Sequence, residues 1–204
     1  MEKKRNYKEY LAKNTLLTVL LMSVFAAVII YAYFYINNVT KPLIPDTIRK
    51  KTEAEILIEK DLELAYPATP TEVLRLHLRI TKSLYNDKLT KEEINDLVNQ
   101  ERMLYDEELL EKNPVESQIR IINEEIDKFH EFDKELTNYL IENKEDFNYW
   151  IEEDVEYASI VASISFAESK EIIKVFEQFT LRRDENGQWR ILGWELSDKD
   201  SIKI

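Results

Sequence analysis

Cysteine is absent from this chain of 204 residues. Its absence excludes disulfide bonds, thiolate metal sites, cysteine nucleophiles and the lipid-modified cysteine of a lipoprotein. Glycine is nearly absent too. The only two glycines, Gly187 and Gly193, both lie in the stretch DENGQWRILGWEL. Glycine-rich phosphate-binding loops are therefore excluded, and the G-x-S-x-G and H-E-x-x-H motifs of common hydrolases do not occur.

Positive charge is scarce in most of the chain. The net charge is −12, but residues 1–51 carry nine Lys and Arg against three Asp and Glu, which is +6. Residues 52–204 must then carry −18. A domain this acidic repels the phosphates of nucleic acids, so we expect no nucleic-acid partner.

Charge is missing altogether from residues 15–36, TLLTVLLMSVFAAVIIYAYFYI. A helix of this length spans about 33 Å, which matches the apolar core of a bilayer. This pattern predicts a cytoplasmic tail over 1–14, an uncleaved transmembrane helix over 15–36, a linker over 37–51 and a soluble domain over 52–204. Five basic residues precede the apolar run, which predicts a cytoplasmic N-terminus and a C-terminal domain outside the cell membrane.

Helices are predicted where four segments carry the capping-box pattern, in which a cap residue is followed three positions later by glutamate. These segments are Thr52–Glu55, Thr69–Glu72, Thr90–Glu93 and Asn113–Glu116. The helix that starts at Thr69 is apolar on two sides, which predicts packing on both. The helix from Thr90 is predicted to end before Asn113, and the helix from Asn113 to end at Asp133.

Beyond the helices the apolar period changes from 3.6 to 2, which predicts a meander of antiparallel strands. Residues 136–143 fit either a first strand or the end of the preceding helix. In EIIKVFEQFTLRR the apolar positions alternate, with Phe176 and Glu177 as exceptions. Gly187 is expected in a tight turn at positive φ, and Gly193 at a bulge that bends the last strand. The predicted fold class is α+β: one N-terminal transmembrane helix, then helices packed on a curved antiparallel meander sheet.

Two resemblances rest on these segments. The helices from YPATPTEVLRLHLRITKSLYN onward and the strands that close with FTLRRDENGQWRILGWEL resemble the nuclear transport factor two-like superfamily of α+β cones. The arrangement of tail, apolar run and the motifs KDLELAYPATPTEVLRLHLRI, DEELLEKNP and WRILGWEL is similar to an uncharacterised family of single-pass membrane proteins of clostridial gut bacteria. The resemblance covers residues 52–197 and the apolar run, and it implies an architecture rather than an activity.

Candidate site residues are few. Cones of this kind often hold a pocket between the long helix and the concave sheet, and His77 is the only acid–base candidate for such a pocket. Trp189 and Trp194 are the other pocket candidates, because they flank the expected bend. The alternative for His77 is a half-buried core residue, and His130 is expected in solvent or in an ion pair.

No residue of the chain is predicted to be catalytic or to ligate a metal. The acidic runs Glu152–Glu156 and Asp106–Glu108 lack a calcium-loop pattern and are interpreted as solvated surfaces. The aromatic residues Phe147, Tyr149, Trp150 and Tyr157 are interpreted as core residues of a strand. No cofactor is expected.

Two functions fit this sequence. The first is a non-enzymatic, membrane-anchored domain outside the cytoplasm that binds a protein partner, a copy of itself or a component of the cell envelope. The second is a small-molecule-binding domain or an enzyme that uses a pocket around His77. If the second is correct, replacing His77 by Phe is expected to abolish binding with little change in thermal stability.

Overall fold

The computed structural model describes residues 49–169 and 171–197. The chain divides into two compact units, Met1–Lys50 and Lys51–Ile204, and the fold described here belongs to the second. Its α-helices are α2 (Glu53–Ile58), α3 (Pro70–Asn86), α4 (Lys91–Arg102), α5 (Glu107–Lys112) and α6 (Val115–Glu131). Its strands are β1 (Glu135–Ile141), β2 (Asn148–Glu152), β3 (Val155–Glu168), β4 (Glu171–Arg183) and β5 (Trp189–Leu196), with a short 3-10 helix at Lys144–Asp146.

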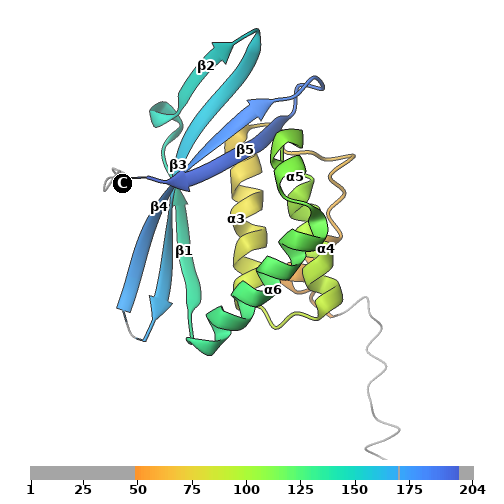
Figure 1. Ribbon diagram of the computed structural model, residues 1–204, viewed down its shortest axis with the longest axis vertical. Coiled ribbons are helices and arrows are strands. Elements are labelled where there is room, and N and C mark those ends of the chain that lie inside the picture. Colours follow the sequence, from red (N-terminus) through yellow and green to blue (C-terminus); the bar gives the residue numbers. More distant parts are fainter. Residues whose placement is uncertain (1–48, 170, 198–204) are drawn as a thin grey trace, which may run out of the picture. The chain divides into compact units, whose positions relative to one another are not determined.

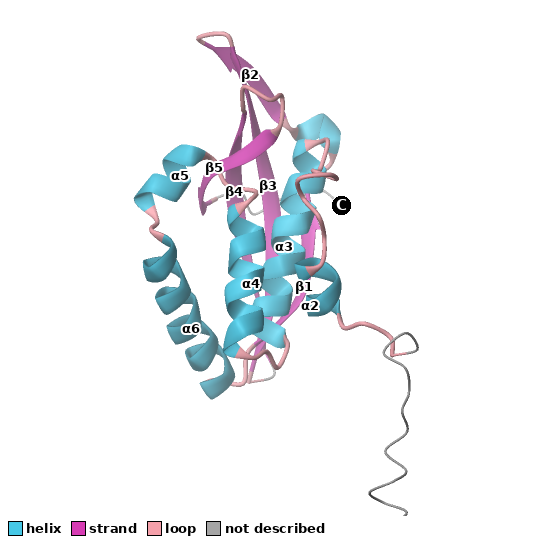
Figure 2. Cartoon of the chain, turned by 90° about the vertical axis from the view of Figure 1, so that its right-hand side faces the viewer, coloured by secondary structure: helices cyan, strands magenta, loops and turns pink. Residues whose placement is uncertain are grey.

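The strands form one antiparallel sheet around β3, in the order β1-β3-β4-β5. Two strands share one edge of β3, because β1 pairs with its second half and β2 with its first half. From β2 to β5 each strand pairs with the next one in sequence, as in a meander. Residues 135–141 form a strand, which settles the alternative left open by the sequence. Figures 1 and 2 show the helices gathered on one face of this sheet.

The long helix α3 lies at the centre of the domain. It contacts β1 and β5 on one side and α2, α4 and α6 on the other. Its buried residues therefore cover two sides of the helix, as its apolar pattern predicted: Val73, Leu74, Leu76, His77, Leu78, Ile80 and Leu84. The sheet completes this core with residues such as Ile160, Phe179 and Ile191, none of which is exposed.

Three of the four predicted capping boxes are confirmed. The side chains of Thr52, Thr69 and Thr90 each accept a hydrogen bond from the backbone N–H three residues later, and the glutamate carboxylate at that position accepts one from the backbone N–H of the cap residue. The fourth prediction is wrong, because Pro114 occupies the N-cap position of α6 and makes no side-chain cap hydrogen bond. Asn113 instead ends a helix, α5, that the sequence analysis did not predict.

The helix from Thr90 is also shorter than predicted. It ends at Arg102, and Leu104 and Tyr105 are buried in a turn rather than in a helix. The carboxylate of Asp106 then accepts a hydrogen bond from the N–H of Glu108 and starts α5. This new start explains the break, because a side chain that caps a new helix must leave the helical backbone conformation of the previous one.

The predicted fold class is wrong in its membrane helix. The described residues form an α+β fold with a five-stranded antiparallel sheet, and none of their helices combines the length and apolarity needed to cross a bilayer. The two longest, α3 and α6, have 17 residues each and carry charged side chains on one side. Residues 15–36, which the sequence analysis assigned to that helix, lie outside the described residues, as do the tail 1–14 and most of the linker 37–51.

The two glycines differ in what they require. Gly187 has a φ of +75°, a conformation that L-residues rarely adopt, and it follows Asn186 in the turn between β4 and β5. Near Gly193 the pairing of β4 with β5 shifts register, because Thr180 pairs with Gly193 and Leu181 with Ile191. Both predictions, the turn and the bulge, are confirmed.

Candidate ligand-binding pocket

A cavity of about 810 Å³ lies between α3, α6 and the helix-facing side of the sheet. It opens to solvent, because lining residues such as Ile121, Phe132 and Trp194 are 43–56% exposed. Its size falls within the range of about 300–1,000 Å³ that is usual for small-molecule sites. Most of the wall is apolar or aromatic, and a few charged groups lie among these residues. The polar and charged side chains in this wall include those of His77, Thr81, Glu101, Tyr105, Glu125 and Glu177.

A buried histidine–glutamate pair forms part of this wall. The Nδ1 of His77 on α3 lies 3.0 Å from the Oε1 of Glu101 on α4, and the two side chains are only 6% and 5% exposed. The two atoms are close enough for an ion pair, but their geometry does not form a hydrogen bond, and Nδ1 has no other hydrogen-bond partner among the described residues. The hydroxyl of Thr81 lies 3.2 Å from the same Glu101 oxygen.

Tyr105 is the third group on Glu101. Burial raises the pKa of the Tyr105 phenol well above its ordinary value, and the neighbouring Glu101 carboxylate, to which it is hydrogen-bonded, raises it further. Tyr105 is therefore a neutral donor across the physiological pH range. Glu101 is surrounded by His77, Thr81 and Tyr105, so its charge is stabilised within the protein.

Four rings pack together at this point. His77 lies 5.5 Å from the ring centres of Phe179 and Trp194 and 6.0 Å from that of Tyr105. Trp194 is stacked on Phe179 at 5.8 Å. Phe179 is fully buried, but Trp194 is 43% exposed, so the cluster reaches from the core to the surface of the pocket.

Glu177 contributes a second carboxylate to the wall. It lies on β4 on the row that faces the helices, between Val175 and Phe179, and its partners across the sheet are Ala162 and Leu196. Within residues 49–169 and 171–197 its carboxylate has no hydrogen bond and no salt bridge. Burial raises the pKa of Glu177, and the His77 ring opposes this rise.

The helix α6 forms the outer wall. Of the residues in its apolar row only Ile126 is buried, whereas Ile119, Ile122 and Phe129 are partly buried against the core. The amphipathic pattern therefore predicted the correct side of the helix but not its distance from the core. Opposite α6, the hydroxyl of Tyr85 donates to the Oε2 of Glu125 at 2.6 Å, which ties α3 to α6 across the pocket.

The three pocket candidates of the sequence analysis have different places. His77 and Trp194 both line the pocket. Trp189 does not. It is 8% exposed, its ring meets Tyr149 edge-on, and its carbonyl accepts a hydrogen bond from Tyr66 at 2.8 Å.

Glu101, Tyr105 and Glu177 were not identified as site residues from the sequence. A signal was present for both glutamates, because each occupies a position where the local pattern calls for an apolar side chain. Glu177 interrupts the alternation of β4, and Glu101 lies seven residues after Ile94 on the apolar side of α4. The abundance of acidic residues hid both exceptions.

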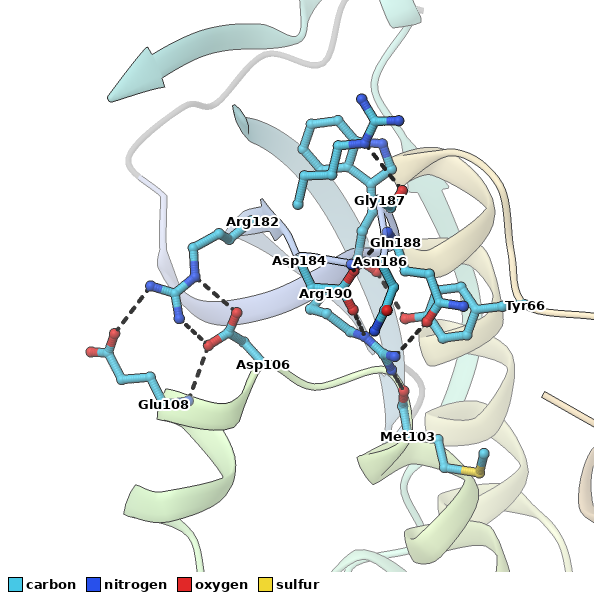
Figure 3. A network of polar contacts seen from close by, with 12 residues as sticks. Tyr66, Met103, Asp106, Glu108, Arg182, Asp184, Asn186, Gly187, Gln188 and Arg190 are labelled. Carbon is cyan, nitrogen blue, oxygen red and sulfur yellow. Dashed lines mark hydrogen bonds and ion pairs between the residues drawn. The ribbon is translucent and has the colours of Figure 1, made fainter. Parts of the chain in front are cut away.

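A second group of charges, which we call the hairpin network, lies where β4 and β5 meet the α4–α5 turn (Figure 3). It consists of Tyr66, Asp106, Arg182, Asp184 and Arg190. Asp106 is 4% exposed and receives two hydrogen bonds from Arg182, one of them 2.9 Å long from Nε. Arg190 lies 3.0 Å from Asp184 and 4.4 Å above the Tyr66 ring, and it also donates to the carbonyl of Met103.

The backbone reinforces this network. The N–H of Ile191 donates to Leu104 at 2.8 Å, and the N–H of Asp106 donates to Ile191 at 2.9 Å. Burial raises the pKa of Tyr66 to about 12, although the Arg190 guanidinium opposes the rise. The interpretation of Asp106–Glu108 as a solvated run is therefore wrong for Asp106, which is buried and fully paired.

The remaining candidates show no chemistry of their own. The Nε2 of His130 is exposed and lies 3.0 Å from the carbonyl of Tyr85. Of the four aromatic residues, Phe147 is buried, Tyr149 is 46% exposed, and Trp150 and Tyr157 stack on each other at 5.1 Å. Within the described part of the chain, no group of three or more His, Asp or Glu side chains could hold a metal ion.

The family model described as a domain of unknown function (DUF6715) matches residues 1–194. No curated protein matches the chain.

Proposed function

The chain belongs to this DUF6715 family, whose description states no activity, and we propose from the pocket that its domain binds a small organic molecule. The observation that supports the proposal most strongly is a large, mostly apolar cavity whose wall contains a half-buried carboxylate, Glu177, with no hydrogen bond or salt bridge among the described residues. Apolar pockets with a few convergent polar groups are the usual form of ligand sites.

The resemblance to the nuclear transport factor two-like superfamily supports the same proposal. Helices on one face of an antiparallel sheet are consistent with such a cone, and the pocket lies between the long helix and the sheet, where cones of that kind often hold one. The finer assignment to this superfamily is part of the proposal. Binding rather than catalysis is proposed, because the Glu101 carboxylate is already in contact with His77 and Thr81.

A fragment screen followed by NMR tests the proposal. Ligands are expected to shift the signals of the Trp194 indole and of Tyr105, and a bulky side chain in the wall is expected to weaken their binding. Ile121 lines the pocket and Ile56 on α2 does not, yet both are 45% exposed, so they form a matched pair. Ile121→Trp should weaken binding by about tenfold and Ile56→Trp should not. Hits that shift only residues outside the pocket, or that tolerate Ile121→Trp, would contradict the proposal.

A second candidate function is a protein-interaction module, because several apolar side chains lie on the surface at the ends of strands. Ile151, Ile172 and Leu196 are 71–75% exposed, and exposed apolar side chains favour protein contacts where they form a patch. This candidate, with a partner protein or a second copy of the chain, is tested by sedimentation of the purified protein. A strict monomer at high concentration would count against self-association.

The location predicted from the sequence, at the cell membrane with the C-terminal domain outside, concerns residues outside the described part and stays a prediction. Because the chain has no cysteine, Glu185→Cys in the exposed β4–β5 turn provides a single labelling site. An impermeant maleimide should label this cysteine in intact cells. Labelling only after lysis would place the domain inside the cell.

A further inference from the structure

We propose that the pocket binds an organic cation, an alkyl- or arylammonium, with Glu177 as its counter-charge and with Trp194 and Tyr105 as aromatic walls. The inference rests on the proposed binding function and adds the chemical class of the ligand. Two features support it: the Glu177 carboxylate, which has no salt bridge among the described residues, and the Trp194 and Tyr105 rings in the same pocket.

Glu177 supplies the first step. Glu177 is half-buried, and an ionised carboxylate that loses part of its water is stabilised by a hydrogen-bond donor or a positive charge. In the sheet its neighbours are Ala162 and Leu196, which offer no side-chain donor. Among the described residues it has no hydrogen bond or salt bridge, and the nearby His77 is already in contact with Glu101. A ligand that carries positive charge would supply what the fold does not.

The aromatic cluster supplies the second step. A tryptophan face attracts an organic cation through its negative π surface, and tyrosine does so less strongly. Trp194 and Tyr105 both line the pocket, with ring centres 5.9 Å apart. Trp194 rests on Phe179 on one side and remains 43% exposed, so part of its surface is available to a ligand.

The distribution of charge argues against an anionic ligand at this place. Glu101 and Glu177 both line the wall near Trp194, together with His77, which is in contact with Glu101. The lysines that line the cavity, Lys128 and Lys134, belong to the end of α6 and the turn after it, which Figure 1 shows away from β5. Lys134 is also paired with Glu168 at 3.1 Å.

The remaining volume suggests an apolar group on the cation. A cavity of about 810 Å³ is much larger than an ammonium group. Between α3, α6 and the sheet its wall contains Leu84, Ile122, Phe129, Ile164 and Phe166. An alkyl or aryl substituent on nitrogen would fill this part of the pocket and displace water from it.

Choline and its neutral analogue 3,3-dimethyl-1-butanol test the inference, because they share one shape and differ in charge. Titrations of the full chain followed by NMR at neutral pH should show choline bound at millimolar concentration. The alcohol should bind about tenfold more weakly, and benzoate should bind more weakly than either. Glu177→Gln keeps the shape of the side chain and removes its charge. It should weaken choline binding by about tenfold and change the affinity for the alcohol less than twofold.

Glu195→Gln is the matched control, since it makes the same charge change on exposed β5, at the partner of Gln178 on the other side of the sheet. It should leave both affinities unchanged within about twofold. If the alcohol or benzoate binds as well as choline, or if Glu177→Gln has no effect on choline, the cation inference is wrong while the pocket remains a ligand site. If neither these probes nor any fragment shifts Trp194 or Tyr105, both this inference and the proposed function fail.

Discussion

The hairpin network and the pocket contain similar charged groups, but these groups differ in how many hydrogen bonds and opposite charges surround them. In the hairpin network each buried charge has an opposite charge and several hydrogen bonds. Asp106 meets Arg182, and Arg190 meets Asp184, the Tyr66 ring and the Met103 carbonyl. In the pocket, Glu101 is similarly surrounded, but Glu177 has no hydrogen bond or salt bridge with any residue in 49–169 or 171–197.

This difference separates charges that stabilise the fold from a charge that is available for binding a ligand. A buried charge with a complete set of partners holds elements together, and removing one partner leaves the other unsatisfied. A half-buried carboxylate without partners makes the folded state less stable, and function is a common reason for such a cost. Substitutions in the hairpin network are therefore expected to lower the free energy of unfolding of the protein, and replacement of Glu177 is expected to raise it.

The largest effect is expected at Asp106. Asp106→Ala removes the partner of Arg182 and the cap of α5 together, which should lower the free energy of unfolding by about 3 kcal/mol. Urea unfolding followed by circular dichroism measures this loss. Glu108→Gln is the control, because Glu108 is an outer partner of Arg182 at 3.6 Å and is about half exposed. If Asp106→Ala is as mild as Glu108→Gln, the hairpin network does not stabilise the fold.

His77 is expected to show the next largest effect. It is 5% exposed and contacts Glu101 and three rings, so His77→Phe should cost about 2 kcal/mol by leaving Glu101 with fewer partners. This differs from the expectation from the sequence of nearly unchanged thermal stability, because the pairing with Glu101 was not foreseen.

A double-mutant cycle separates pairing from packing at this position. His77→Phe, Glu101→Gln and the double variant should give a coupling energy of about 1 kcal/mol in urea unfolding. Additive effects would show that His77 is held by its ring contacts alone.

The contrast between β4 and α6 shows how much of this fold the sequence could predict. Strand β4 has an apolar row and a polar row, so its two sides followed from alternation, and Glu177 was an exception to it. Helix α6 has an equally clear apolar side, but only one of its residues is buried. Periodicity gives the direction in which a helix faces and not how closely it packs, so the pocket between α6 and the sheet could not be predicted.

Pairings between distant residues were also beyond sequence reasoning. Asp106 and Arg182 are 76 positions apart, and His77 and Glu101 are on different helices. The sequence identified His77 as a pocket candidate, but in a chain this rich in acidic residues no local pattern shows which carboxylate pairs with which basic side chain. The end of α4 at Arg102 was missed for a related reason, because Leu104 and Tyr105 continue the apolar pattern although the backbone has left the helix.

Glu177→Gln is expected to stabilise the unliganded protein by about 1 kcal/mol at neutral pH, because it removes a half-buried charge that has no hydrogen bond or salt bridge among the described residues. The pKa of Glu177 is raised in the folded state, so the folded protein holds its proton more tightly than the unfolded chain. The penalty of ionising Glu177 is therefore absent below its unfolded pKa of about 4.3 and is fully present above its raised folded pKa. The gain from Glu177→Gln should grow as pH rises through that window.

Urea unfolding of both proteins across this pH range tests the expectation, with Glu195→Gln as the exposed control. A loss of stability in Glu177→Gln at neutral pH would show that the carboxylate has a structural partner and would remove the contrast between the two regions.

The smallest effects concern the two glycines, one in each region. Gly187→Ala in the hairpin turn should cost about 1 kcal/mol, because alanine must adopt a φ of +75° there. A Cβ at Gly193, which lines the pocket, would meet no atom within 4 Å, and its φ is not positive. Gly193→Ala should therefore change the free energy of unfolding by less than about 0.5 kcal/mol. Thermal and urea unfolding of the two variants side by side measure the difference. Equal losses would mean that the bend at Gly193 needs glycine as much as the turn does, and that the wall of the pocket is as constrained as the hairpin network.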